Sequence, residues 1–202
     1  MKKIAIVAFL LAVSVAAGRA QESRQDISLS GFGLIEPFVS SSTNVYVHST
    51  PAYGALLSYR FMLTPSSALE ANYGITYQNK IRFVTNPLTP EVLVRTQEVS
   101  GAYVRSFNFR KFNPFVEGGG AGLIFLPIRN SGTTTLDARQ ETKTAFLYGA
   151  GIAYEISPSF DNRAEYRGLV TKVPTFNVPN DLTKTNKWYN IYEPTIGVAY
   201  HF

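Results

Sequence analysis

The chain has 202 residues, no cysteine and a formal net charge of +5. Without cysteine there is neither a disulfide framework nor a lipidated cysteine anchor, so stability must come from packing or from a membrane. Removing the first 20 residues leaves 16 basic against 14 acidic side chains, so the charge of the rest is close to balanced. The basic residues are scattered among acidic ones rather than clustered, which argues against a nucleic-acid partner.

The first 20 residues have the pattern of a secretory signal peptide. Lys2 and Lys3 precede an apolar stretch over residues 4–17, and small residues follow around Arg19. At about 14 residues the stretch is shorter than the roughly 20 of a transmembrane helix. We therefore expect a signal peptide over residues 1–20 and one domain over residues 21–202.

Beyond residue 20, strand-like segments recur to the end of the chain, and none is apolar for long enough to span a membrane as a helix. Each segment provides the ~9 to 11 residues of a tilted transmembrane strand. We expect eight strands, at about residues 27–40, 50–62, 66–79, 92–107, 112–126, 140–156, 159–173 and 190–202.

These segments alternate between two unlike faces, which is the period of a strand. In residues 67–78, apolar or aromatic side chains such as Leu69 and Tyr73 alternate with polar ones such as Glu70 and Asn72. A barrel in lipid turns the apolar face outward and the small or polar face inward. Aromatic residues near the predicted strand ends can form girdles at both interfaces.

The predicted connections alternate in length. Short turns are expected near residues 64–66, 109–111 and 157–159, and long polar loops near 40–49, 79–91, 128–139 and 171–189. If the first strand starts in the periplasm, every short turn is periplasmic and every long loop is outside, as in outer-membrane barrels.

The charged side chains of these strands fall mainly on the small and polar face. A Lys or Arg on the lipid face costs about 2 to 4 kcal/mol at the bilayer midplane, so inward positions are favoured. Arg105 is expected to face outward, at the periplasmic rim, where that cost is small. An eight-stranded barrel is narrow enough for side chains to fill it, which predicts a packed, hydrated polar interior. The predicted interior network is Glu36, Arg60, Glu70, Glu98, Glu117, Glu155, Arg163, Glu165, Arg167 and Glu193.

Two further patterns lie in the fifth and eighth segments. The glycine-rich residues 118–122 lack the Lys-Ser/Thr of a phosphate loop, and their flanks predict a strand in which small residues permit bending. The last segment alternates from Ile196 to Phe202 and ends on an aromatic residue. We expect Phe202 on the lipid face and His201 in the interior at the periplasmic rim.

The signal peptide, the eight segments, residues 113–120 and the terminal Tyr200-His201-Phe202 together resemble the small OmpA-like outer-membrane β-barrel domain family. The resemblance covers the whole mature chain. It implies an all-β fold, an eight-stranded antiparallel up-and-down transmembrane β-barrel of the bacterial outer membrane, with both ends in the periplasm. It also implies insertion by the barrel-assembly machinery, with Tyr200 and Phe202 as the assembly signal. Because the chain ends at the barrel, a peptidoglycan-binding domain that tethers the membrane to the cell wall is not expected.

The leading functional hypothesis is a non-enzymatic scaffold whose extracellular loops serve envelope integrity or surface interaction. Its partners would be outer-membrane lipids and an extracellular ligand that the sequence does not identify. No cofactor is expected. Two histidines, no cysteine and dispersed carboxylates do not specify a metal site.

Three alternatives remain at this stage. One is a narrow, porin-like channel or hydrophobic-ligand conduit. Another is a lipid-modifying barrel enzyme, for which His48 beside Ser49 and the inward His201 are the candidate bases. The last is a soluble, lipocalin-like periplasmic barrel.

Overall fold

The computed structural model describes residues 24–40, 46–84, 91–128, 138–176 and 187–202. The predicted signal peptide lies outside this part of the chain. Among the described residues, no helix is long and apolar enough to cross a membrane. The strands are β1 (Gln25–Leu34), β2 (Val39–Ser40), β3 (Tyr46–Ser49), β4 (Ala52–Thr64), β5 (Ser67–Thr76), β6 (Asn79–Val84), β7 (Glu91–Ser106), β8 (Phe112–Pro127), β9 (Glu141–Ser157), β10 (Phe160–Lys172) and β11 (Trp188–His201).

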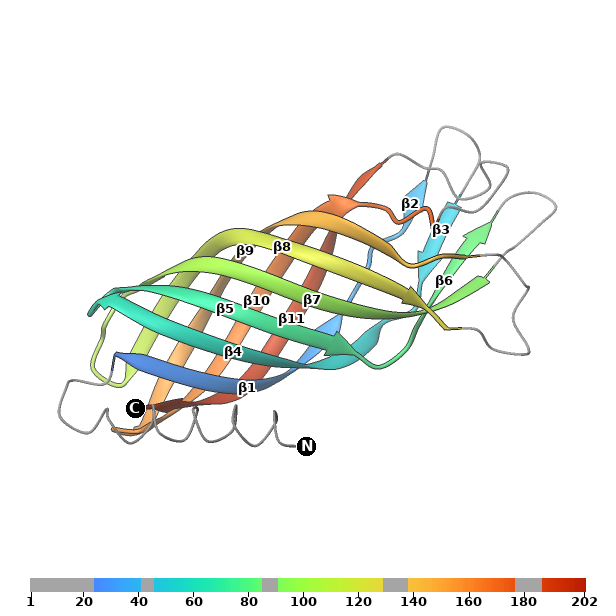
Figure 1. The fold of residues 1–202 in the computed structure, drawn as a ribbon. Helices are drawn as coiled ribbons and strands as arrows, with labels where there is room; N and C mark the ends of the chain where they lie inside the picture. Colours follow the sequence, from blue (N-terminus) through green and yellow to red (C-terminus); the bar gives the residue numbers. More distant parts are fainter. Residues whose placement is uncertain (1–23, 41–45, 85–90, 129–137, 177–186) are drawn as a thin grey trace, which may run out of the picture.

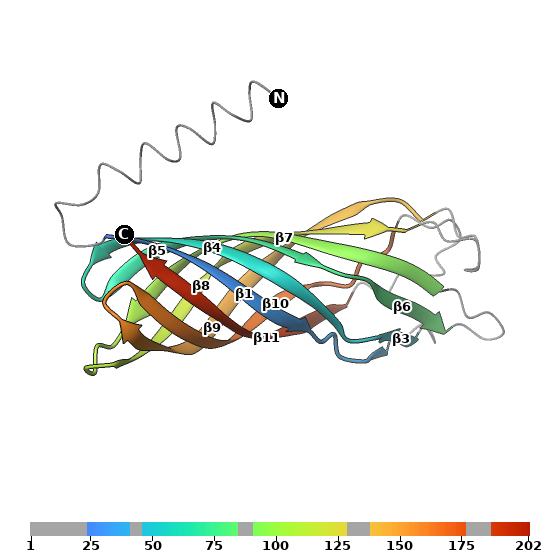
Figure 2. The ribbon, with the colours of Figure 1, turned by 90° about the horizontal axis from the view of Figure 1, so that it is seen from below.

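Eight of these strands close into one antiparallel barrel (Figures 1 and 2). β1 pairs with both β4 and β11, and β7 pairs with both β5 and β8, so the sheet returns on itself. The order around the barrel is β1, β4, β5, β7, β8, β9, β10 and β11. Closure pairs the backbone groups that an open sheet would leave unpaired in lipid. The predicted eight-stranded antiparallel barrel is confirmed.

The short connections lie at one end of the barrel, where the C-terminus also lies (Figure 1). They join β4 to β5, β7 to β8 and β9 to β10. The Phe202 N–H donates to the Gln25 carbonyl at 3.0 Å, which holds both ends of the described chain at this rim. We call this end the short-turn end and the other the long-loop end.

Two of the predicted long loops are partly strand. β2, β3 and β6 extend the sheet beyond the closed barrel at the long-loop end, where β6 pairs with β7 and β3 pairs with β6 (Figure 1). The prediction missed β3 because it placed residues 40–49 in a long polar loop, and Pro51, which has no N–H, separates β3 from β4. The backbone at the break is still bonded, because the Thr50 N–H donates to the Lys80 carbonyl at 3.0 Å.

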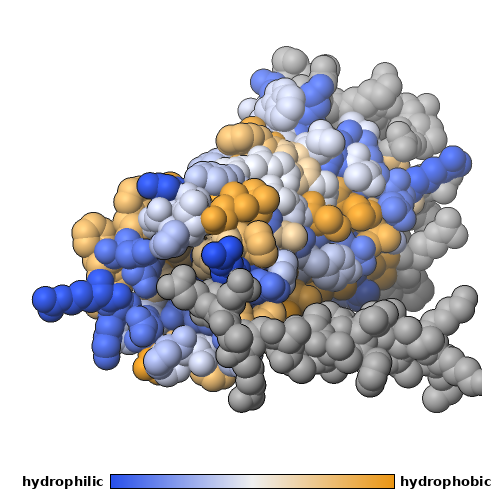
Figure 3. Space-filling view, turned by 60° about the vertical axis from the view of Figure 1, so that its left-hand side comes forward, coloured by the Kyte–Doolittle hydropathy of each residue, from blue (hydrophilic) through white to orange (hydrophobic). Residues whose placement is uncertain are grey.

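The two faces of the strands are sorted as the alternation predicts. In β5, Leu69 and Tyr73 are exposed on the outside, and Glu70 and Asn72 are buried inside. Apolar residues form broad patches on the visible wall in Figure 3. A soluble barrel would not expose so large an apolar surface, which contradicts the lipocalin-like alternative.

Candidate functional site: the filled barrel interior

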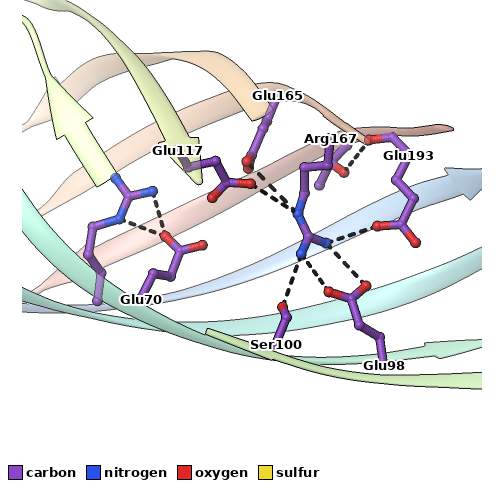
Figure 4. Close-up of polar contacts among 9 residues, drawn as sticks. Glu70, Glu98, Ser100, Glu117, Glu165, Arg167 and Glu193 are labelled. Atoms are coloured by element: carbon purple, nitrogen blue, oxygen red, sulfur yellow. Dashed lines mark hydrogen bonds and ion pairs between the residues drawn. The ribbon is translucent and has the colours of Figure 1, made fainter. Parts of the chain in front are cut away.

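A single buried arginine, Arg167, organises the middle of the interior (Figure 4). β10 directs it inward, and its guanidinium lies 2.6 Å from Glu98 Oε1 and 3.0 Å from Glu193 Oε2. Its Nε lies 3.4 Å from Glu117 Oε1, and its Nη2 donates to Ser100 Oγ at 3.2 Å. Side chains from three other strands, β7, β8 and β11, therefore converge on this one side chain of β10. We call Arg167 and these four partners the Arg167 cluster.

Two further ion-pair groups fill the barrel between this cluster and the short turns. Arg60 on β4 pairs with Glu70 on β5, with Nη2 to Oε2 at 2.5 Å, and lies over the Phe115 ring at 4.9 Å. Arg163 on β10 donates twice to the Asp26 carboxylate on β1, at 2.9 and 2.7 Å. This bidentate geometry is the strong form of such a pair.

His201 completes the group at the short-turn end. Its Nε2 lies 2.7 Å from Asp161 Oδ2, and its Nδ1 lies 3.8 Å from Asp26 Oδ2. The ring thus bridges carboxylates of β10 and β1, the two strands that flank the terminal strand β11. This contact fixes the seam at which the barrel closes.

The interior changes character toward the long-loop end, where apolar side chains replace the ion pairs. Leu123, Leu147, Leu169 and Ile191 are fully buried there and belong to one apolar cluster. The buried ion pairs therefore occupy the half nearer the short turns. The other half is an apolar core.

Phe176 closes that apolar half from above. It follows β10, is fully buried, and has a φ of 51°, a left-handed conformation that is unusual for a bulky residue. Its ring meets Phe83 and Phe125 edge-on, at centroid distances of 6.1 and 6.4 Å. Glu141 Oε2 holds the segment by accepting the Thr175 and Phe176 N–H groups at 2.6 and 2.7 Å.

The outer surface carries aromatic residues near both rims. At the short-turn end, Tyr200 contacts Phe160 at 5.1 Å and Phe202 at 6.0 Å between ring centroids. At the long-loop end, Tyr53 and Tyr77 stack with their planes 4° apart. Such belts lie at the level of lipid head groups.

The comparison with known families agrees with this geometry. The family model described as "Outer membrane protein beta-barrel domain" matches residues 5–202. The chain belongs to the outer membrane β-barrel family. It is a protein of the bacterial outer membrane and sits in the lipid bilayer. No curated protein matches its sequence.

Three solved structures show the same fold as this outer membrane barrel. The outer membrane protein OprG from Pseudomonas aeruginosa is 11% identical, with a TM-score of 0.64 over 90% of this chain and 97% of that one. Neisserial surface protein A is 12% identical, with a TM-score of 0.58 over 89% and 98%. The N-terminal barrel of Pseudomonas aeruginosa OprF is 17% identical, with a TM-score of 0.51 over 90% and 100%. Such low identities concern the fold alone.

Most residues of the predicted interior network meet in this barrel protein, and two do not. Arg60 and Glu70 pair with each other, and Arg163 pairs with Asp26, which was outside the predicted set. Arg167 lies among the other four, which are Glu98, Glu117, Glu165 and Glu193. Of these, Glu165 is the most distant, at 4.0 Å. Glu36 lies at the long-loop end, where Asn79 Nδ2 approaches it to 3.5 Å. Glu155 is only half-buried and forms no ion pair within the described residues.

The predicted interior network omitted two residues that lie inside the barrel, Asp26 and Asp161. Asp161 shares a face with Arg163, so the alternation already marked it as inward. Asp26 lies just before the first predicted strand, which begins at about residue 27. Extending the alternation of Ile27 and Leu29 back by one residue would have placed it inside.

The remaining sequence patterns have structural roles in the barrel wall. Residues 118–122 lie within β8, paired on both sides, as predicted for a strand. Gly119 packs against the backbone of Gly101, where a side chain would not fit. Arg105 faces outward at the short-turn rim and donates to Ser67 Oγ at 2.8 Å. Within the described part of the chain, no cluster of His, Asp or Glu is arranged to hold a metal ion.

Proposed function

We propose that this protein is a non-enzymatic scaffold, whose sealed barrel presents its extracellular segments for envelope integrity or surface interaction. The observation that carries the proposal is the filled interior. Ion pairs occupy the half nearer the short turns, and an apolar core capped by Phe176 occupies the other half. A narrow barrel filled with side chains offers no evident path for solutes.

The surroundings of the histidines support a role without catalysis. The His48 ring is exposed and packs on Phe38 at a centroid distance of 4.5 Å. The His201 ring is engaged with carboxylates on both sides. A Ser–His mechanism needs a histidine within reach of a serine and a carboxylate that orients it. Insertion by the barrel-assembly machinery, with Tyr200 and Phe202 as signal, stays a prediction.

The competing function is a narrow channel or a conduit for hydrophobic ligands. The apolar long-loop half favours an apolar ligand, because its lining would accept one. The Arg167 cluster lies directly below and would oppose its passage, since an apolar ligand cannot replace the ion pairs there. The scaffold is therefore the better-supported function.

Planar-bilayer recording of the refolded protein tests the proposal. We expect inserted wild-type protein to give no stable conductance, and Glu165→Gln to behave in the same way. Phe176→Ala serves as the comparison, because it opens the apolar cap without touching the ion pairs. Stable wild-type conductance that Glu165→Gln alters would contradict the scaffold proposal and support a channel.

A further inference from the structure

The sheet extension at the long-loop end has a basic outer face. Its inward residues, such as Ile81 and Phe83, are buried, so the alternate positions point outward. These outward positions carry Lys80 and Arg82 on β6, and Arg95 lies on the outward side of neighbouring β7. The three cations therefore share one surface of the molecule.

One carboxylate partly neutralises this face. Glu91 lies 3.3 Å from Lys80 Nζ and 2.6 Å from Arg82 Nε. Arg95 is exposed and forms no ion pair with any residue that the structure describes. Three cations against one carboxylate leave the face with a net positive charge.

A hollow of about 400 Å³ lies beside Arg95 on the outside of the wall. Tyr53, Ala55, Ile75 and Tyr77 contribute its apolar and aromatic lining. The two tyrosine rings stack at 6.0 Å between centroids and form one side of it. An apolar chain can lie in this hollow, next to a guanidinium that projects into solvent.

The hollow arises from the break between β5 and β6. Thr76 and Thr96 close the backbone across that break, because the Thr76 hydroxyl accepts the Thr96 N–H at 2.9 Å and donates to the Thr96 carbonyl at 3.2 Å. The Tyr77 N–H turns instead to the Tyr53 carbonyl at 2.8 Å. The wall stays closed while its outer layer of side chains is interrupted, so the hollow is part of the fold.

The position of this surface relative to the membrane indicates which kind of ligand it meets. Tyr53 and Tyr77 belong to the aromatic belt at the long-loop end, which lies at the head groups of the outer leaflet. Arg95 is thus held at the height of lipid phosphates, with Lys80 and Arg82 just beyond. Arginine recognises phosphate through two parallel N–H donors, which suits it to this role.

We propose that this surface binds an acylated, phosphorylated sugar of the outer leaflet, of the lipid A type. Arg95 and Lys80 bind phosphate, and one acyl chain lies along Tyr53 and Tyr77 in the hollow. The inference rests on the proposed scaffold role, because it names the partner that the outside of the sealed barrel engages. The scaffold proposal and the lipid-binding proposal can fail independently. Conductance measurements test the barrel interior, whereas lipid binding tests this outer face.

The test measures binding of lipid A with both phosphates to the folded, full-length mature protein in nonionic detergent micelles. Lys80→Gln with Arg95→Gln removes two outward cations and leaves the Arg82–Glu91 pair intact. We expect the affinity to fall roughly 10- to 30-fold, because each Lys or Arg near an anionic surface is worth about a factor of five. Lipid A of equal acylation without phosphate should bind the wild type as weakly as lipid A binds the variant.

Arg105→Gln with Lys111→Gln is the matched control. It removes two exposed cations at the opposite, short-turn rim and should leave the affinity unchanged. Retained heat-modifiable gel mobility shows that each variant is folded. Equal affinity of the wild type and the Lys80/Arg95 variant would overturn the proposal. Equal wild-type affinity for phosphatidylglycerol would also overturn it, since any anionic lipid would then suffice.

Discussion

Among single residues, Arg167 has the largest share in holding the interior together. It is fully buried and forms ion pairs with carboxylates of β7, β8 and β11 at once. The described ion-pair half contains seven carboxylates and three arginines: Asp26, Glu70, Glu98, Glu117, Asp161, Glu165 and Glu193, with Arg60, Arg163 and Arg167. Arg167 is shared among Glu98, Glu117 and Glu193, so its loss leaves several buried carboxylates without a counter-charge.

Replacing Arg167 with methionine should destabilise the barrel by about 3 to 5 kcal/mol, the cost of breaking a buried ion pair from one side. The free energy of unfolding in urea measures the change. Arg105→Met, at an exposed rim position, should stay within about 0.5 kcal/mol of wild type. Equal stabilities of the two variants would refute the central role of Arg167.

Glu36 predicts a pH dependence of stability. It lies outside the membrane-spanning strands, where burial raises its pKa from 4.5 to about 7 although the neighbouring Ser49 and Tyr189 hydroxyls act to lower it. Between these values the folded protein binds a proton that the unfolded chain has released. Stability should therefore fall as the pH rises from about 4.5 to 7, by roughly 3 kcal/mol in total.

Urea unfolding of the wild type and Glu36→Gln at about pH 5 and pH 8 measures this contribution. The variant cannot ionise at this position, so its stability should fall less between the two pH values. An identical pH dependence in both proteins would show that Glu36 stays ionised in the folded state.

At the scale of elements, the segment after β10 is held to the start of β9 by Glu141. Its carboxylate accepts hydrogen bonds from the backbone N–H groups of Thr175 and Phe176. The left-handed backbone of Phe176 is otherwise unfavourable. The carboxylate thus fixes the conformation that inserts the ring into the apolar core.

Glu141→Ala should release this segment. Hydrogen bonds to charged groups contribute about 1.5 to 3 kcal/mol, so the amides of Thr175 and Phe176 should exchange with deuterium about 10 to 100 times faster. Glu155→Ala, on the same strand but without an ion pair among the described residues, is the control. Unchanged exchange in Glu141→Ala would mean that ring packing alone holds Phe176.

Sequence alternation was sufficient for the eight barrel strands, because every wall residue meets either lipid or the interior, but it did not identify the extension strands β3 and β6. It placed Arg60 and Glu70 inside but could not pair them, since the pairing depends on the register between β4 and β5. It could not find Phe176, because a loop residue has no periodicity to follow. It included Glu155, which is only half-buried and forms no ion pair with the residues that the structure describes.

For the whole molecule, the two halves of the interior have separate roles. The ion pairs join strands that are distant in sequence, such as β1 with β10, and so lock the closure of the barrel. The apolar half supports the sheet extension that projects beyond the membrane, because Ile81 and Phe83 of β6 are part of its core. A rigid, filled wall is what a scaffold for extracellular segments requires.

The central claim, that the interior is sealed, is tested most directly by one thiol. The chain has no cysteine, and Ser100 lies in the Arg167 cluster, so Ser100→Cys places a single small reporter in the middle of the barrel. Ser159→Cys, at an exposed short turn, is the control. We predict that a charged methanethiosulfonate reagent labels Ser159→Cys at once, and labels Ser100→Cys only after unfolding. Rapid labelling of Ser100→Cys in the folded barrel would contradict the account.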